Sequence, residues 1–150
     1  LREDKGFTYG AYSSFNGMKD YGTFIASSSV RSDATFESVK IFKDLMTDYR
    51  KGVSQADVDF TRSSLLRANA RRFETLYALL EMLSTMTEYD LPADYIKQEE
   101  DYLQGLTIEQ MNETVKKYID PDRMYYVIVG DAATQLNDLS AIGFGKPVVE

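Results

Sequence analysis

Segments rich in aromatic and β-branched residues stand near both ends of the chain and bracket a long block with helical periodicity. The first, FTYGAYSSFNGMKDYGTFIASSSV, divides around Asn16-Gly17 and a short polar loop, and it predicts a hairpin that pairs roughly residues 7–15 with 20–30. The second, Met124–Val129, is an almost wholly apolar run with β preference and predicts a central strand buried on both faces. Helices grouped between such segments indicate an α+β fold, with a largely antiparallel sheet covered by helices on one face.

Helical periodicity covers most of residues 32–119. Apolar residues recur at spacings of three and four from Phe36 to Tyr49, and again from Val58 to Leu83, which predicts amphipathic helices. A break is expected at 69–72, where polar or small residues interrupt the apolar stripe. The residue before a proline disfavours helix, so Leu91-Pro92 is expected to end the preceding helical segment. A further helix is expected over about 93–104.

Short polar patterns mark the expected ends of helical segments. Thr107 and Gln110 have the capping-box spacing, and Ser54 and Asp57 have the same spacing with a less preferred partner. Gly6 follows five residues that read as the last turn of a helix, and it is expected to take the left-handed conformation that stops it. The chain after 130 predicts a short helix, a glycine turn and an extended end.

Composition limits the classes of protein to be considered. The 150 residues are 43% hydrophobic, which suits one globular domain over residues 1–150, with its first strands expected upstream of Leu1. The net charge of -7 argues against nucleic acid as a partner, because phosphates require a basic face. No apolar run approaches the ~18–20 residues of a membrane helix, so no membrane insertion is expected.

The chain contains neither histidine nor cysteine. Histidine is the commonest general base near neutral pH and, with cysteine, supplies most zinc ligands. The usual zinc sites and Ser-His-Asp or Cys-His constellations therefore cannot be built from this chain alone. No catalytic residue and no metal ligand is predicted here, and any such group must come from elsewhere.

Several local patterns are better explained without a site. The carboxylates of Gln98–Asp101 point in different directions on a helix and indicate a solvated face. Ser27–Ser29 have no base to activate a nucleophile, and GFGKP lacks the P-loop pattern. The sequon at Asn112 falls inside a predicted helix and is taken as chance.

The opening run, LREDKGFTYG, is different. On composition alone it predicts a surface helix end followed by an edge strand, with Arg2 in solvent and Tyr9 half-buried. The run resembles, however, a signature of the insulinase-like (pitrilysin, M16) zinc metallopeptidases and of proteins similar to mitochondrial processing peptidase. That signature reads Leu-Arg-Glu, a basic pair or similar, Gly, an apolar residue, one more residue and Tyr.

Further segments resemble landmarks of the same family, and their order and spacing cover most of the chain. They are Gly52-Val53-Ser54 with Asp57, Arg72-Phe73-Glu74-Thr75, Tyr89 to Tyr95, Leu106-Thr107, Tyr118 to Asp122 and Val127 to Asp131.

The resemblance implies a partial M16/LuxS-like metallohydrolase domain. Such proteins pair two homologous α+β domains, in one chain or between subunits, around a zinc site that only one of them carries. The other domain supplies an Arg and a Tyr to the substrate, and these correspond to Arg2 and Tyr9. The chain is thus identified as a non-catalytic C-terminal domain fragment that binds peptide substrate. Zinc is expected in the homologous partner domain or subunit and not in this chain.

Two alternatives stay open. A structural or assembly subunit of the same fold would retain Arg2 and Tyr9 without proteolysis, and an unrelated α+β ligand-binding domain would require the motif series to be coincidence. Resemblance to bacterial two-domain members favours the cell envelope or periplasm, with the cytoplasm as the alternative location.

Overall fold

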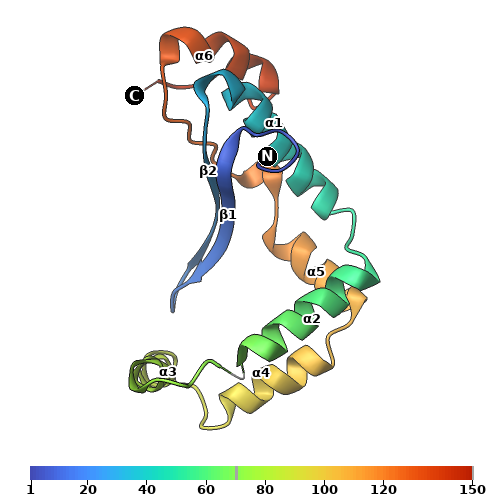
Figure 1. Ribbon diagram of the computed structural model, residues 1–150, viewed down its shortest axis with the longest axis vertical. Helices are drawn as coiled ribbons and strands as arrows, with labels where there is room; N and C mark the ends of the chain where they lie inside the picture. Colours follow the sequence, from blue (N-terminus) through green and yellow to red (C-terminus); the bar gives the residue numbers. More distant parts are fainter. Residues whose placement is uncertain (70, 150) are drawn as a thin grey trace. The chain divides into compact units, whose positions relative to one another are not determined.

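The computed structural model describes residues 1–69 and 71–149. A hairpin of β1 (Thr8–Gly17) and β2 (Gly22–Val30) forms the sheet of the described chain. A short 3₁₀ turn, η1 (Ser32–Ala34), leads from β2 into α1 (Thr35–Tyr49) (Figure 1). The remaining elements are α2 (Gln55–Asn69), α3 (Leu76–Tyr89), α4 (Tyr95–Gln104), α5 (Ile108–Tyr118), η2 (Pro121–Arg123), α6 (Ala132–Leu139) and η3 (Ser140–Ile142).

The predicted hairpin is confirmed, but Asn16 and Gly17 are the last residues of β1 rather than part of the connection. The strands turn in the polar loop that follows, where the Met18 N–H donates to the Tyr21 carbonyl at 2.7 Å. The rings of Phe15 and Phe24 lie 4.8 Å apart across the strands. Such cross-strand aromatic pairs stabilise a ladder, so pairing continues past the point at which Asn-Gly would have ended it.

The predicted strand over Met124–Val129 is wrong, because this run forms no strand within the described residues. Its backbone groups make no backbone hydrogen bond to any residue that the structure describes. Tyr125 and Val129 are each 98% exposed, so the run is not buried on both faces. A strand needs a neighbour as well as β preference, and the β1–β2 hairpin does not provide one here.

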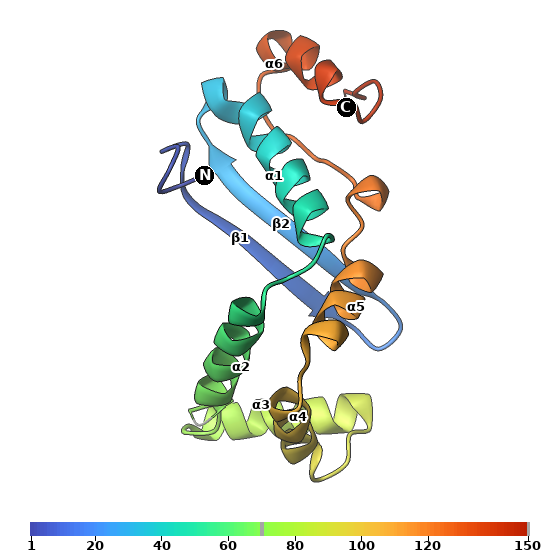
Figure 2. The same ribbon diagram turned by 90° about the vertical axis from the view of Figure 1, so that its right-hand side faces the viewer.

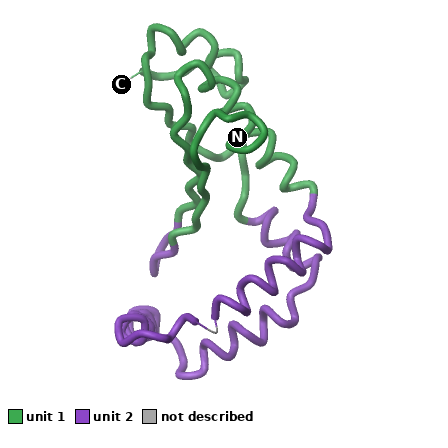
Figure 3. The backbone as a smooth tube through the Cα atoms, in the orientation of Figure 1, with its two compact units in different colours: residues 1–16, 23–51, 118–150 green, residues 17–22, 52–117 purple. Residues whose placement is uncertain are grey.

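The chain divides into two compact units (Figure 3). Unit 1 comprises residues 1–16, 23–51 and 118–150, and unit 2 comprises residues 17–22 and 52–117.

Unit 1 contains most of the hairpin, α1 and the C-terminal helices. Within it, α1 lies along one face of the hairpin, as the two views in Figures 1 and 2 show. Ala34 and Ile119 are buried, and the Arg50 guanidinium donates to the Ile119 carbonyl. The glycine turn predicted near the C-terminus is confirmed by the left-handed Gly143 and Gly145.

Unit 2 contains α2 to α5, and its interior is small. The buried apolar residues that the structure describes there are Val53, Val58, Tyr95, Leu106 and Val115.

Both predicted capping boxes are confirmed at the starts of α2 and α5. The Ser54 N–H donates to Asp57 Oδ2 at 2.8 Å, and the Thr107 N–H donates to Gln110 Oε1 at 2.9 Å. The break predicted near 69–72 is also confirmed on the described residues, because α2 ends at Asn69 and α3 begins at Leu76.

The apolar stripe predicted for the second half of this region is largely uncovered. No residue of α3 is buried, and Leu76, Leu80 and Leu83 are 87%, 60% and 55% exposed. Amphipathic periodicity identifies the helix correctly, but within the described residues its apolar face meets no covering layer.

Candidate functional site

A tight loop precedes β1 and carries the first of the two predicted site residues. The Gly6 N–H donates to the Arg2 carbonyl at 2.9 Å, and the Phe7 N–H donates to the Leu1 carbonyl at 3.1 Å. Gly6 has a φ of +62°, the left-handed conformation expected for it. Because side-chain-bearing residues populate this region reluctantly, glycine is what lets the chain reverse here and enter the strand.

Three contacts hold this loop to the rest of unit 1. The Arg31 N–H donates to the Phe7 carbonyl at 3.1 Å, which joins the loop to the end of β2. The guanidinium of Arg31 lies 6.0 Å from the centre of the Phe7 ring. Lys5 Nζ donates to Glu37 Oε1 of α1 at 2.7 Å, and this hydrogen bond and the charge of Glu37 raise the pKa of Lys5.

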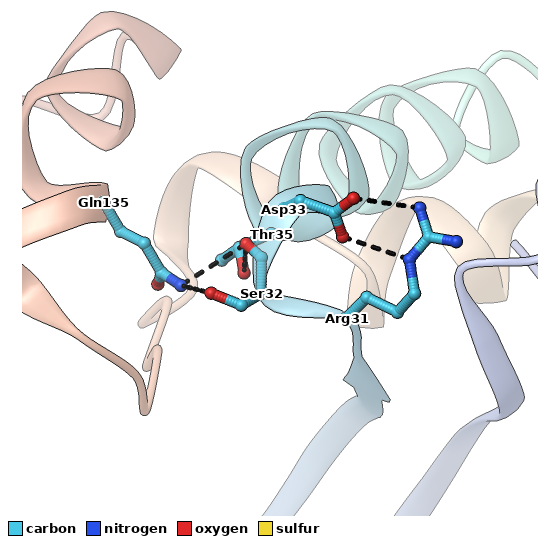
Figure 4. A network of polar contacts seen from close by, with 5 residues as sticks. All are labelled: Arg31, Ser32, Asp33, Thr35 and Gln135. Carbon is cyan, nitrogen blue, oxygen red and sulfur yellow. Dashed lines mark hydrogen bonds and ion pairs between the residues drawn. The ribbon is translucent and has the colours of Figure 1, made fainter.

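A polar network at the junction of β2, η1 and α6 supports Arg31 in turn (Figure 4). Its guanidinium donates to both carboxylate oxygens of Asp33, at 3.0 and 3.1 Å, and the hydrogen bonds from Arg31 lower the pKa of Asp33. Gln135 Nε2 donates to Ser32 Oγ at 3.1 Å and so connects α6 to the same junction. Sequence reasoning missed this network, because Gln135 lies 103 positions from Ser32 in the chain and the residues match no motif.

A cluster of hydroxyls fixes the first residues of β1. The Thr8 hydroxyl lies 2.7 Å from the Ser29 carbonyl and 2.9 Å from the Ser28 hydroxyl. Ser28 Oγ also lies 2.9 Å from the Gly10 carbonyl. Ser28 and Ser29 of β2 therefore support strand pairing, and their contacts restrict the backbone on both sides of Tyr9.

The two predicted site residues lie on this supported frame with their side chains in solvent. The side chain of Arg2 is 67% exposed and lies 3.2 Å from Glu3. Tyr9, the second residue of β1, is 98% exposed, rather than half-buried as composition suggested, and its hydroxyl makes no hydrogen bond within the described residues. The structure places both residues within a few positions of the Gly6 turn but records no contact between their side chains.

The exposed groups have clear chemical capacities. A guanidinium is a planar fork that can bind a carboxylate or a peptide carbonyl through two parallel hydrogen bonds. A tyrosine hydroxyl can donate a hydrogen bond to an oxygen that gains negative charge during a reaction. Both groups are available to an external ligand, because among the described residues the guanidinium contacts only an exposed neighbouring carboxylate and the hydroxyl has no hydrogen-bond partner.

The described residues do not fit a zinc site. The sequence has no histidine or cysteine, and the described part of the chain contains no group of three acidic side chains arranged to hold a metal ion. Among those residues, no helix is both long and apolar enough to cross a membrane.

Comparison with solved structures finds several that match in fold, among them the following two. A peptidase M16 inactive domain from Pseudomonas fluorescens superposes with a TM-score of 0.74 at 28% sequence identity, over 81% of this chain and 29% of that one. The periplasmic protease PqqL from Escherichia coli superposes with a TM-score of 0.66 at 20% identity, over 79% of this chain and 14% of that one. No protein-family model matches the sequence, and no curated protein matches it significantly.

The fold and the comparison together define an α+β domain, and the predicted fold class is confirmed. More particularly, the chain is similar in fold to a peptidase M16 inactive domain, as the resemblance of its motifs predicted. It spans less than a third of the length of either solved chain.

Proposed function

We propose that this chain binds peptide substrate for an M16-type zinc peptidase whose metal site lies in another domain or subunit. Arg2 grips the peptide through a carbonyl or carboxylate, and the Tyr9 hydroxyl donates to the oxygen of the scissile carbonyl. The observation that carries the proposal is the placement of two exposed side chains beside a glycine turn that three separate contacts hold in position.

The chemistry explains why a domain without a metal would matter to hydrolysis. Attack on a peptide carbonyl puts negative charge on its oxygen, and a donor aimed at that oxygen lowers the barrier. Removing one such donor typically costs about 10²–10³ in rate, or about 3–4 kcal/mol. A donor on a strand whose first residues are fixed by the Thr8 and Ser28 hydroxyls loses little freedom when the peptide arrives.

The test is kinetic, on the enzyme that contains this chain together with its zinc-bearing partner. Tyr9→Phe should lower kcat for peptide hydrolysis by about 10²–10³, because only the hydroxyl donor is removed. Arg2→Ala should mainly raise KM, and Arg2→Lys should restore only part of the loss, since lysine keeps the charge but not the fork. Zinc content should equal that of the wild type in every variant.

Tyr12→Phe is the matched control, because Tyr12 lies on the same strand and is 74% exposed. It should hydrolyse peptide at the wild-type rate. Wild-type kinetics in both the Arg2 and Tyr9 variants would refute substrate binding and would favour the alternative of a structural or assembly subunit. PqqL, which shares the fold, is a periplasmic protease, and the cell envelope is accordingly the location that we propose.

A further inference from the structure

Phe7 joins the two exposed side chains of the candidate site through the backbone. Its N–H donates to the Leu1 carbonyl at 3.1 Å, next to Arg2, and it precedes Tyr9 by two residues. Among the described residues the side chains of Arg2 and Tyr9 make no recorded contact with each other, so their relative placement depends on the backbone between them. A group that fixes Phe7 therefore fixes both.

Arg31, the residue after β2, contacts Phe7 in two ways. Its backbone N–H donates to the Phe7 carbonyl at 3.1 Å, and its guanidinium lies 6.0 Å from the centre of the Phe7 ring. The first contact sets the position of the Phe7 backbone, and the second restricts its ring at the outer limit of a cation–π interaction. The backbone contact survives any substitution of Arg31 except proline, so a change of side chain removes the ring contact alone.

The guanidinium of Arg31 is itself held in one orientation. Its Nε and Nη2 donate to the two carboxylate oxygens of Asp33 at 3.0 and 3.1 Å, which is the two-bond fork of an arginine–carboxylate pair (Figure 4). The two side chains are 61% and 71% exposed, so solvent screens the pair and it contributes little to folding stability. What the pair provides is geometry, because two parallel hydrogen bonds fix the plane of the guanidinium.

The backbone around Arg31 connects this pair to the packed part of unit 1. The Arg31 carbonyl accepts from the Ala34 N–H at 3.0 Å, and Ala34 is buried. The neighbouring Ser32 hydroxyl accepts from Gln135 Nε2 of α6 at 3.1 Å. Arg31 thus extends from a supported junction to a loop in which residues 2–6 are exposed.

We propose that Arg31 is a positioning residue for the candidate site. Its guanidinium, oriented by Asp33, restricts the ring of Phe7. That restraint holds Arg2 and Tyr9 at the spacing that a bound peptide requires. The inference rests on the proposed function, because Arg31 acts through Phe7 and does not contact the substrate. Displacement of a reacting group by about 1 Å can cost about 10² in rate, so a restraint outside the site is sufficient to matter.

A double-mutant cycle in peptide hydrolysis tests the proposal, on the enzyme that contains this chain and its zinc-bearing partner. Arg31→Gln should lower kcat/KM by about ten- to a hundredfold, as expected when a hydrogen-bond donor is misplaced rather than lost. In the Arg31→Gln background, Tyr9→Phe should cost at least about tenfold less than in the wild type, because the hydroxyl is already misplaced. A merely structural role of Arg31 would leave the cost of Tyr9→Phe unchanged.

Two further variants separate orientation from charge. Asp33→Ala keeps Arg31 and removes the carboxylate that orients it, and it should reproduce most of the effect of Arg31→Gln. Arg31→Lys keeps the positive charge without the fork and should recover little of the activity. Lys51→Gln is the matched control, because it breaks another exposed pair of unit 1, with Asp48 at 2.6 Å, and it should leave kcat and KM unchanged.

The 150-residue chain provides a readout that needs no partner. The amides of Gly6 and Phe7 close the loop onto the carbonyls of Arg2 and Leu1. Arg31→Gln should speed hydrogen exchange at these two amides by about tenfold, because the loop opens more often. The thermal midpoint should stay within about 2 °C of the wild type, as expected for a substitution in an exposed pair.

The possible results distinguish this inference from the proposed function. Wild-type kinetics in Tyr9→Phe and Arg2→Ala would refute the proposed function and, with it, the task assigned to Arg31. The expected losses in those two variants, with wild-type kinetics for Arg31→Gln or additive effects in the cycle, would overturn the positioning role alone. Full recovery in Arg31→Lys would also overturn it, because charge rather than orientation would then be the cause.

Discussion

Val58 offers the sharpest test of the packing described for unit 2. It has no exposed surface at all, and it is the largest side chain of the described residues to be fully buried. Val58→Ala removes two methyl groups, which costs about 1.6 kcal/mol at ~0.8 kcal/mol for each buried carbon. The cavity left behind, of about 40 Å³, adds about 1 kcal/mol at ~24 cal/mol per Å³. The expected loss of unfolding free energy is therefore about 2.5 kcal/mol.

Val127→Ala is the matched control, because it deletes the same atoms from a side chain that is 84% exposed. In the 150-residue chain it should change the unfolding free energy by less than about 0.5 kcal/mol. Urea unfolding followed by circular dichroism measures the unfolding free energy of the wild type and of both variants. Sulfate is added to stabilise the folded state, because a chain with so small an interior is expected to be only marginally stable. The slope of free energy against urea should be the same in all three proteins.

Similar losses of unfolding free energy in the two variants, or a loss below about 1 kcal/mol for Val58→Ala, would contradict the described packing. Either result would mean that α2 is not packed as described and that the interior of unit 2 lies elsewhere.

Two further substitutions probe individual backbone positions, each read from the thermal midpoint of unfolding. Gly6→Ala should lower the stability by about 1 kcal/mol, because a φ of +62° disfavours any side chain. Gly17→Ala is the control and should cost less, because Gly17 has equally open surroundings and no positive φ. Equal losses in the two variants would show that the φ of Gly6 is not the cause. Asn112→Ala should cost about 1–3 kcal/mol because Asn112 Oδ1 accepts from the buried Val53 N–H at 2.8 Å, and Asn112→Asp, which keeps an oxygen acceptor, should retain more of that stability than alanine does.

Local signals in the sequence predicted local structure well. Both capping boxes form as expected, because their hydrogen bonds join residues only three positions apart. The left-handed Gly6 and the glycine turn near the C-terminus follow from the same kind of short-range rule. The end of β1 shows the limit of such rules, since Asn16-Gly17 lies within the strand and a cross-strand contact between Phe15 and Phe24 outweighed the preference of Asn-Gly.

What the sequence could not provide is the partner of each apolar surface. Met124–Val129 has the composition of an interior strand, and α3 has the stripe of a packed helix, yet both are open in the described chain. Composition states that a surface should be covered but not which segment covers it, because strand pairing and helix packing join residues that are distant in the chain.

At the candidate site, too, the sequence provided a short motif but not the long-range contacts around it. Arg2 and Tyr9 were found through the likeness of a short motif to a known family, and no periodicity or charge pattern would have selected them. The structure adds the frame around them, from Lys5–Glu37 to the Arg31–Asp33 pair, which is built from residues between two and thirty-two positions apart. Their effect on a substrate stays a prediction until it is measured.

The path of the chain into and out of unit 2 bears on what happens when a peptide bond within that unit is cleaved. Apart from residues 17–22, unit 2 is one continuous stretch, 52–117. The Val53–Asn112 bond ties its incoming and outgoing segments on one side of the boundary, and the Arg50–Ile119 bond does so on the other. A peptide bond cut in the exposed turn at Arg71-Arg72 would therefore leave two fragments that remain bound to each other. Such a split pair, made as two separate polypeptides, should reassemble without a covalent link.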